Sequence, residues 1–142
     1  MANTYTTICL RSKFTAYNSE TIKNITIQAN YDDGFIIWIN GIKALERLAP
    51  ANLLTDTLAT ENHESGNNEA FVISTEDLNL VDGENSIAVQ GFNVNLPSTD
   101  FYLDLQMKAE AEVPEVKDTI GLTFSHASGF YSTNFSFNHN FS

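Results

Sequence analysis

Apolar and polar residues alternate with a period of two along much of the chain, a pattern that predicts β-strands. In residues 25–31 and again in residues 101–108, every second position is apolar and the positions between them are polar. Such alternation is typical of a strand with one face on a hydrophobic core and the other in water. The apolar positions of the two segments are Ile25, Ile27, Ala29, Tyr31, Phe101, Leu103, Leu105 and Met107.

Residues 35–39 break this alternation, because all five are apolar and so both faces need cover. We therefore expect a central strand whose single tryptophan, Trp38, lies in the core between two sheets. Asn40 and Gly41 follow, and both tolerate the positive φ angles of a tight hairpin turn. The sequence thus predicts a hairpin with a returning strand after residue 41, and Asp82-Gly83 predicts a second turn that leads into another strand.

The number of such segments predicts an all-β fold, a β-sandwich of seven or eight strands with no long helix. The connection over residues 49–70 has weak periodicity and is long for a compact domain, so we expect function to concentrate there. We expect residues 1–112 to form the sandwich. Residues 113–142 are expected to hold an acidic, proline-bearing linker and a further β segment.

Charge narrows the choice of partners. The chain has 142 residues, with 18 acidic and 7 basic side chains and a formal net charge of -11. That charge repels nucleic acid and anionic membrane surfaces, so neither is an expected partner. No apolar run approaches the roughly 20 residues of a membrane-spanning helix, so we expect no membrane insertion. Cys9 is the single cysteine and cannot form an internal disulfide.

Asp32-Asp33-Gly34 is the sharpest polar motif in the sequence. Adjacent carboxylates repel one another, and Ca²⁺, which takes six to eight oxygen ligands, would relieve that repulsion. Asp32 and Asp33 are therefore the candidate metal ligands, and calcium is the one candidate cofactor. The alternative is a solvated turn before a buried strand.

Sugar binding requires aromatic rings with amides or carboxylates at their rim. The candidate ligand-binding residues are Arg47, His63, Phe92, Asn93, Asn95 and Asp100. The three histidines are scattered and show no zinc-site spacing, and no nucleophile, phosphate-loop or metalloprotease motif is present. The sequence therefore predicts a protein that is not an enzyme.

The segments "YDDGFIIWING", "ATENHESGNNEAF", "LVDGENSIAVQGFN" and "STDFYLDLQM" resemble, in order and spacing, a galactose-binding-like jelly-roll module of secreted bacterial multidomain proteins. The resemblance covers about residues 5–110 and implies a non-catalytic β-sandwich. The tail "IGLTFSHASGFYSTNFSFNHNFS" resembles the first hairpin of a chitobiase C-terminal-like, immunoglobulin-type module. The Asp-Asp-Gly motif is also similar to that of a protective-antigen-type lectin, which implies Ca²⁺ holding sugar hydroxyls.

These observations lead to one expected function and two alternatives. We expect a non-catalytic accessory module of a secreted or cell-surface bacterial protein that binds polysaccharide or cell-envelope glycan. The alternatives are a structural spacer that contacts the neighbouring domains of its parent protein, and a calcium-dependent lectin. The tail carries several aromatic residues without their usual cover, so we expect it either to dock on the sandwich or to self-associate with another chain. The alternative is that its residues are the last two strands of the main sandwich.

Overall fold

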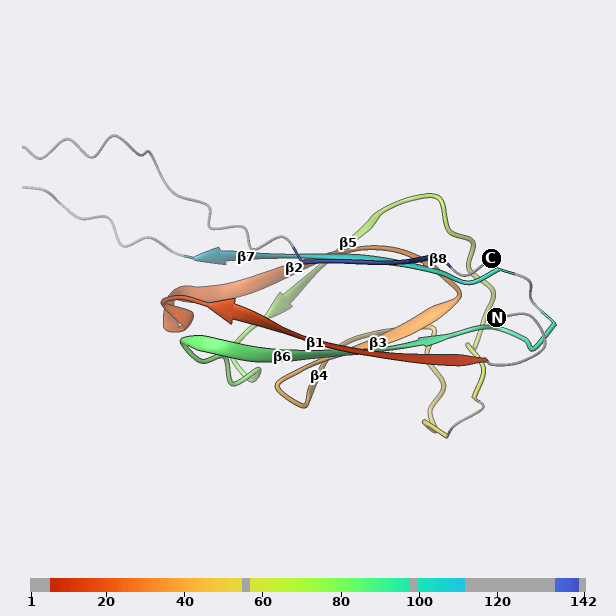
Figure 1. The fold of residues 1–142 in the computed structure, drawn as a ribbon, viewed down its shortest axis with the longest axis horizontal. Helices are drawn as coiled ribbons and strands as arrows, with labels where there is room; N and C mark the ends of the chain where they lie inside the picture. The colour runs from red at the N-terminus through yellow and green to blue at the C-terminus, as the bar shows by residue number, and fades with distance from the viewer. Residues whose placement is uncertain (1–5, 55–56, 98–99, 112–134, 141–142) are drawn as a thin grey trace, which may run out of the picture.

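The chain folds into two stacked antiparallel sheets in a computed structural model, which describes residues 6–54, 57–97, 100–111 and 135–140 (Figure 1). The predicted all-β sandwich is confirmed. The strands are β1 (Thr7–Ala16), β2 (Ile22–Asp32), β3 (Gly34–Ile39), β4 (Ile42–Arg47), β5 (Glu69–Ser74), β6 (Gly83–Phe92), β7 (Tyr102–Ala111) and β8 (Phe135–Asn140), with a short 3-10 helix, η1 (Ser19–Thr21), before β2.

One sheet has the strand order β1-β6-β3-β4 and the other has the order β5-β2-β7-β8. The strand pairings among the described residues are antiparallel, and β2 pairs with β7 over most of its length, from Ile22 opposite Ala111 to Asp32 opposite Tyr102. β2 runs almost directly into β3, so this change from one sheet to the other is made by a tight corner of one residue, Asp33. That corner follows Asp32, the last residue of β2.

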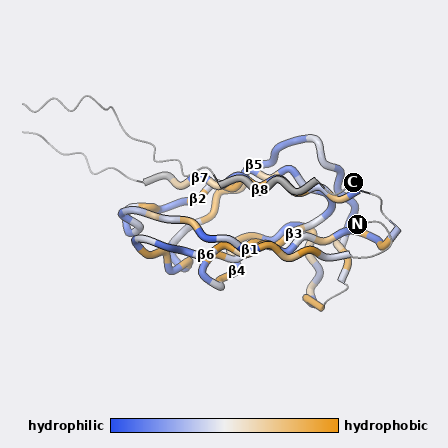
Figure 2. Tube along the Cα trace, in the orientation of Figure 1, coloured by the Kyte–Doolittle hydropathy of each residue, from blue (hydrophilic) through white to orange (hydrophobic). Residues whose placement is uncertain are grey.

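The main core lies between the two sheets and is built from the alternating apolar positions that the sequence predicts. Ile25, Ile27, Ala29 and Tyr31 of β2 are at most 1% exposed, and Leu103, Leu105 and Met107 of β7 are at most 5% exposed. Figure 2 shows the hydrophobic residues gathered along the strands, whereas the segment that leads into β5 is hydrophilic. Burying these side chains is the main source of stability for the sandwich.

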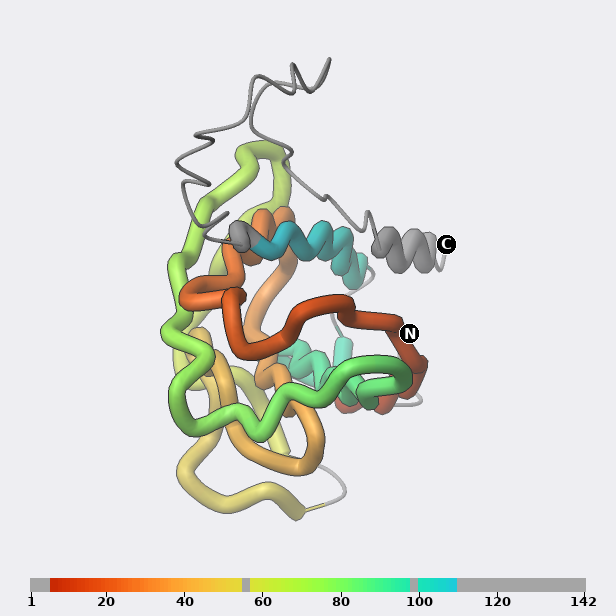
Figure 3. The backbone as a smooth tube through the Cα atoms, turned by 90° about the vertical axis from the view of Figure 1, so that its left-hand side faces the viewer, coloured from red at the N-terminus to blue at the C-terminus, as the bar shows by residue number. Residues whose placement is uncertain are grey.

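The inner strand β3 is covered on both faces, as predicted, but Trp38 is not in the main core. Residues 35, 37 and 39 face the other sheet, so Ile36 and Trp38 face outward by parity. Ile36 is 1% exposed because a second cluster with Phe92 and Ala59 covers it, and Trp38 lies half-buried against that cluster. Figure 3 shows the segment before residue 60 beneath this sheet. The expectation of an indole between the sheets is therefore wrong.

The predicted turns are confirmed, and Asn40 has a second role. Asn40 and Gly41 have φ angles of 49° and 80°, and Gly83 has a φ angle of 96°. The Asn40 Nδ2 group donates to the Leu78 oxygen, the Asn79 oxygen and Asn85 Oδ1. The hairpin turn therefore also ties down the connection between β5 and β6.

Strand β8 joins the main sandwich through β7, with Phe135 opposite Met107 and Asn140 opposite Tyr102. Residues 112–134 lie outside the described residues, and so does most of the predicted immunoglobulin-type segment. The domain boundary at residue 112 stays a prediction. Among the described residues, no helix has the length and apolar character needed to cross a membrane.

Candidate functional site

The candidate site lies at the end of the sandwich where β2 passes into β3. Asp32 ends β2, Asp33 makes the connection and Gly34 begins β3. A Cβ atom at position 34 would lie 2.8 Å from the backbone oxygen of Leu48, a distance that real side chains do not show. Because glycine has no Cβ atom, the corner can pass close to the end of β4. The two residues before it, Asp32 and Asp33, place two carboxyl groups at this corner.

Asp33 acts as an internal anchor. It is 2% exposed, its Oδ1 atom accepts the His63 N–H at 2.9 Å, and its Oδ2 atom accepts the Val94 N–H at 2.6 Å. The Asp33 N–H itself donates to the Phe92 oxygen at 3.2 Å. Because both carboxylate oxygens hold backbone donors, Asp33 joins the connection before β5 to the segment after β6. Asp33 and Asp32, the two predicted metal ligands, therefore differ in their surroundings, and metal binding stays a prediction.

Asp32 faces different neighbours. One carboxylate oxygen from each of Asp32, Glu64 and Asp100 lies within 4.8 Å of the others, and we call these three residues the acidic cluster. Asp32 is 6% exposed, whereas the other two are exposed. Burial is the largest cause that raises the pKa of Asp32, and the charges of Asp33, Asp100 and Glu64 act in the same direction. The Ser65 N–H opposes them, and the resulting pKa is about 6. The fold thus holds three carboxyl groups together against their repulsion.

Asn93 lies beside the acidic cluster and has an unused oxygen. Its side chain is 1% exposed, and its Nδ2 group donates to the Asp100 backbone oxygen at 3.3 Å. This bond fixes which end of the amide is the nitrogen. The Oδ1 atom is buried and has no hydrogen-bond partner among the described residues. A buried oxygen without a donor is a group that a cation or an ordered water satisfies.

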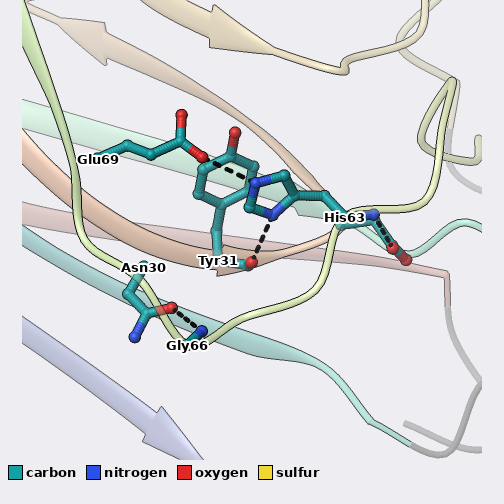
Figure 4. A network of polar contacts seen from close by, with 6 residues as sticks. Asn30, Tyr31, His63, Gly66 and Glu69 are labelled. Carbon is teal, nitrogen blue, oxygen red and sulfur yellow. Dashed lines mark hydrogen bonds and ion pairs between the residues drawn. The ribbon is translucent and has the colours of Figure 1, made fainter.

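The turn of residues 63–66 carries Glu64 and is bound along its length to the end of β2. His63 stacks on the Tyr31 ring, with centroids 4.0 Å apart and planes 4° apart (Figure 4). Its Nδ1 atom lies 2.9 Å from the backbone oxygen of Tyr31, and its Nε2 atom lies 2.8 Å from Glu69 Oε1. His63 is therefore half-buried, and both of its ring nitrogens lie against groups outside the acidic cluster.

The remaining predicted ligand-binding residues are Arg47, Asn95 and Phe92. Arg47 is half-buried at the end of β4, with its guanidinium 5.2 Å from the centre of the Phe71 ring. Asn95 is exposed in the segment after β6. Phe92 is 0% exposed because it fills the second cluster, so it has no surface to offer a ligand. The prediction for Phe92 is therefore corrected.

Of the acidic cluster, the sequence predicted Asp32 as a metal ligand and Asp100 as a ligand-binding residue, and it did not predict that Glu64 lies beside them. Nothing in the spacing of Glu64 relative to Asp32 predicts a contact, since 31 residues lie between them. One signal was present in the sequence: Glu64 lies in a long polar connection, next to His63, which is a predicted ligand-binding residue. The contact becomes visible only when β2 and the 63–66 turn are paired.

Comparisons with known proteins support the fold and leave the family open. No protein-family model matches the sequence, and no relative is found among curated proteins. The structure is similar to part of an α-L-rhamnosidase from Streptomyces avermitilis solved with L-rhamnose, with a TM-score of 0.50 and 15% identity over 78% of this chain and 9% of that chain. A β-D-mannosidase from Dictyoglomus thermophilum matches with a TM-score of 0.37 and 24% identity, over 59% and 8%. This chain spans less than a tenth of either enzyme.

Proposed function

We propose that this chain is a non-catalytic glycan-binding module whose site is centred on a divalent cation held by the acidic cluster. The observation that carries the proposal is the convergence of Asp32, Glu64 and Asp100 within 4.8 Å. Carboxylate oxygens are the ligands that Ca²⁺ prefers, and the ion would offset the repulsion that now raises the pKa of Asp32. The neutral oxygen of Asn93 suits the same role.

The glycan part of the proposal draws on two further observations. The fold is similar to a small part of a glycosidase chain that was solved with a sugar bound. The cluster also opens to solvent through Glu64 and Asp100, so a bound ion would remain accessible to the hydroxyl groups of a sugar. A site of this kind suits the outside of a cell, where Ca²⁺ is abundant enough for weak binding of about 10⁻⁴–10⁻³ M.

Glycan binding with and without calcium tests the proposal. We expect the chain to bind at least one polysaccharide or cell-envelope glycan on an array in Ca²⁺, and to lose that binding in a chelator. Glu64→Gln should weaken it, whereas Glu61→Gln, which changes an exposed carboxylate outside the acidic cluster, should not. Binding that is indifferent to chelation would contradict the ion. The absence of glycan binding would favour the spacer.

A further inference from the structure

We propose that His63 is a positioning residue that presets Glu64 for the cation. The inference rests on the proposed function and adds a residue that touches neither the ion nor the glycan. Glu64 is exposed on a long connection, where a side chain would ordinarily sample many positions. A metal-coordinating side chain on such a segment contributes little to the affinity for the cation unless the segment is already ordered.

The His63 side chain orders this segment by three separate contacts. Its ring stacks face to face on Tyr31, which is 1% exposed and belongs to the main core. Its Nδ1–H group donates to the Tyr31 oxygen, and its Nε2 atom lies against the carboxylate of Glu69 on β5. The imidazole therefore bridges two neighbouring strands of one sheet, and Glu64 is the next residue in the chain.

The backbone of the same turn is held on both sides of Glu64. The His63 N–H donates to Asp33, and the Gly66 N–H donates to Asn30 Oδ1 at 2.8 Å (Figure 4). The Ser65 N–H acts on the Asp32 carboxylate. Three residues of the turn, on both sides of Glu64, are therefore joined to the end of β2 and the corner after it.

Groups that orient a metal ligand without touching the metal are worth about 10- to 100-fold in affinity. We therefore expect His63→Phe to weaken Ca²⁺ binding about tenfold, because phenylalanine keeps the stacking surface and removes both ring nitrogens. All three carboxylates and Asn93 remain in this variant. The measurement is a Ca²⁺ titration of the full chain by calorimetry at constant pH, with Tb³⁺ luminescence as a second probe.

A pair of substitutions at Glu69 separates positioning from general destabilisation. Glu69→Gln keeps a partner for Nε2, because the amide can donate to a neutral imidazole, so its Ca²⁺ affinity should stay within about twofold. Glu69→Ala removes that partner and should weaken binding about threefold or more. Asn85→Ala weakens the opposite end of the sandwich and should leave the affinity unchanged, which controls for lost stability.

The outcomes distinguish this inference from the proposed function. If the unmodified chain binds no Ca²⁺, both are overturned. If it binds Ca²⁺ and His63→Phe binds equally well, only the role of His63 is overturned. If His63→Phe does not fold, Glu69→Ala against Glu69→Gln decides in its place, and equal affinities there overturn the inference.

Discussion

Each end of the sandwich is closed by a buried polar side chain, but the two side chains differ in charge and in their neighbours. At the end with the β3–β4 hairpin, Asn85 is 2% exposed and exchanges hydrogen bonds with Val81, Gly83 and Asn40. At the other end Asp33 is also 2% exposed and accepts two backbone N–H groups. Both side chains tie a connecting segment to a strand, so either chemistry closes an end.

The two ends differ in that the Asp33 end carries more acidic side chains than are needed to close it. The Asn85 side chain is neutral and its hydrogen bonds are internal. The Asp33 end adds the three carboxyl groups of the acidic cluster, and their repulsion together with burial raises the pKa of Asp32 to about 6. Because the Asn85 end shows that neutral amides suffice, the additional carboxylates point to a function that costs some stability.

The largest effect is expected from Asp33→Ala. This variant loses two hydrogen bonds to a charged acceptor and leaves the N–H groups of His63 and Val94 without their partner, so we expect the free energy of unfolding to fall by about 4 kcal/mol. Urea denaturation at pH 7 measures it. A loss below about 1 kcal/mol would mean that Asp33 does not close this end.

Asp32→Asn should act in the opposite direction and with pH. The folded-state pKa of Asp32 is raised from 3.8 to about 6, so its stabilising contribution is present below about pH 4 and is lost as the pH rises through 6. Without Ca²⁺ the variant should therefore gain stability over the parent between pH 4 and 7, by up to about 3 kcal/mol. Urea denaturation of both proteins across this range measures the gain. If the free energies of unfolding of the two proteins differ by the same amount at every pH, the raised pKa of Asp32 would be contradicted.

Asn85→Ala sharpens the comparison from the neutral end. Loss of its hydrogen bonds to Val81 and Gly83 should lower the free energy of unfolding by about 2 kcal/mol. The loss should be the same at pH 4 and pH 7, because no ionisable group takes part. A clear pH dependence in thermal unfolding would show that the two ends are not independent.

The smallest effect is expected from Glu64→Gln and Glu61→Gln. Both residues are exposed, so each substitution should change the free energy of unfolding by less than about 0.5 kcal/mol without Ca²⁺. In millimolar Ca²⁺ the melting temperature should rise less for Glu64→Gln than for the parent, and Glu61→Gln should match the parent. Equal calcium responses in both variants would remove Glu64 from the site.

Most strands and both turns were predictable because they are encoded locally. Period-two alternation identified β2 and β7, and the Asn40-Gly41 pair identified the hairpin through its φ angles. Strand β5 was missed because its residues sit at the end of a long polar connection. Trp38 was misplaced because an all-apolar strand does not reveal which face turns inward, and the connection that covers its outer face is distant in sequence.

The site was predictable only in part, for a related reason. Asp32 stands in a local motif, but its partners Glu64 and Asp100 come from two other segments that only the sheet register brings together. The role of Asp33 could not be read either, because it depends on backbone N–H groups, which every residue except proline carries. Local patterns thus located the corner and could not assign its two carboxylates.

The most direct test is a calorimetric Ca²⁺ titration of the unmodified chain and of Asp32→Asn at pH 7. We predict one ion per chain with a dissociation constant of about 10⁻⁴–10⁻³ M, and no measurable binding by the variant. The absence of binding by the unmodified chain, or equal binding by both proteins, would contradict a cation site at Asp32, Glu64 and Asp100.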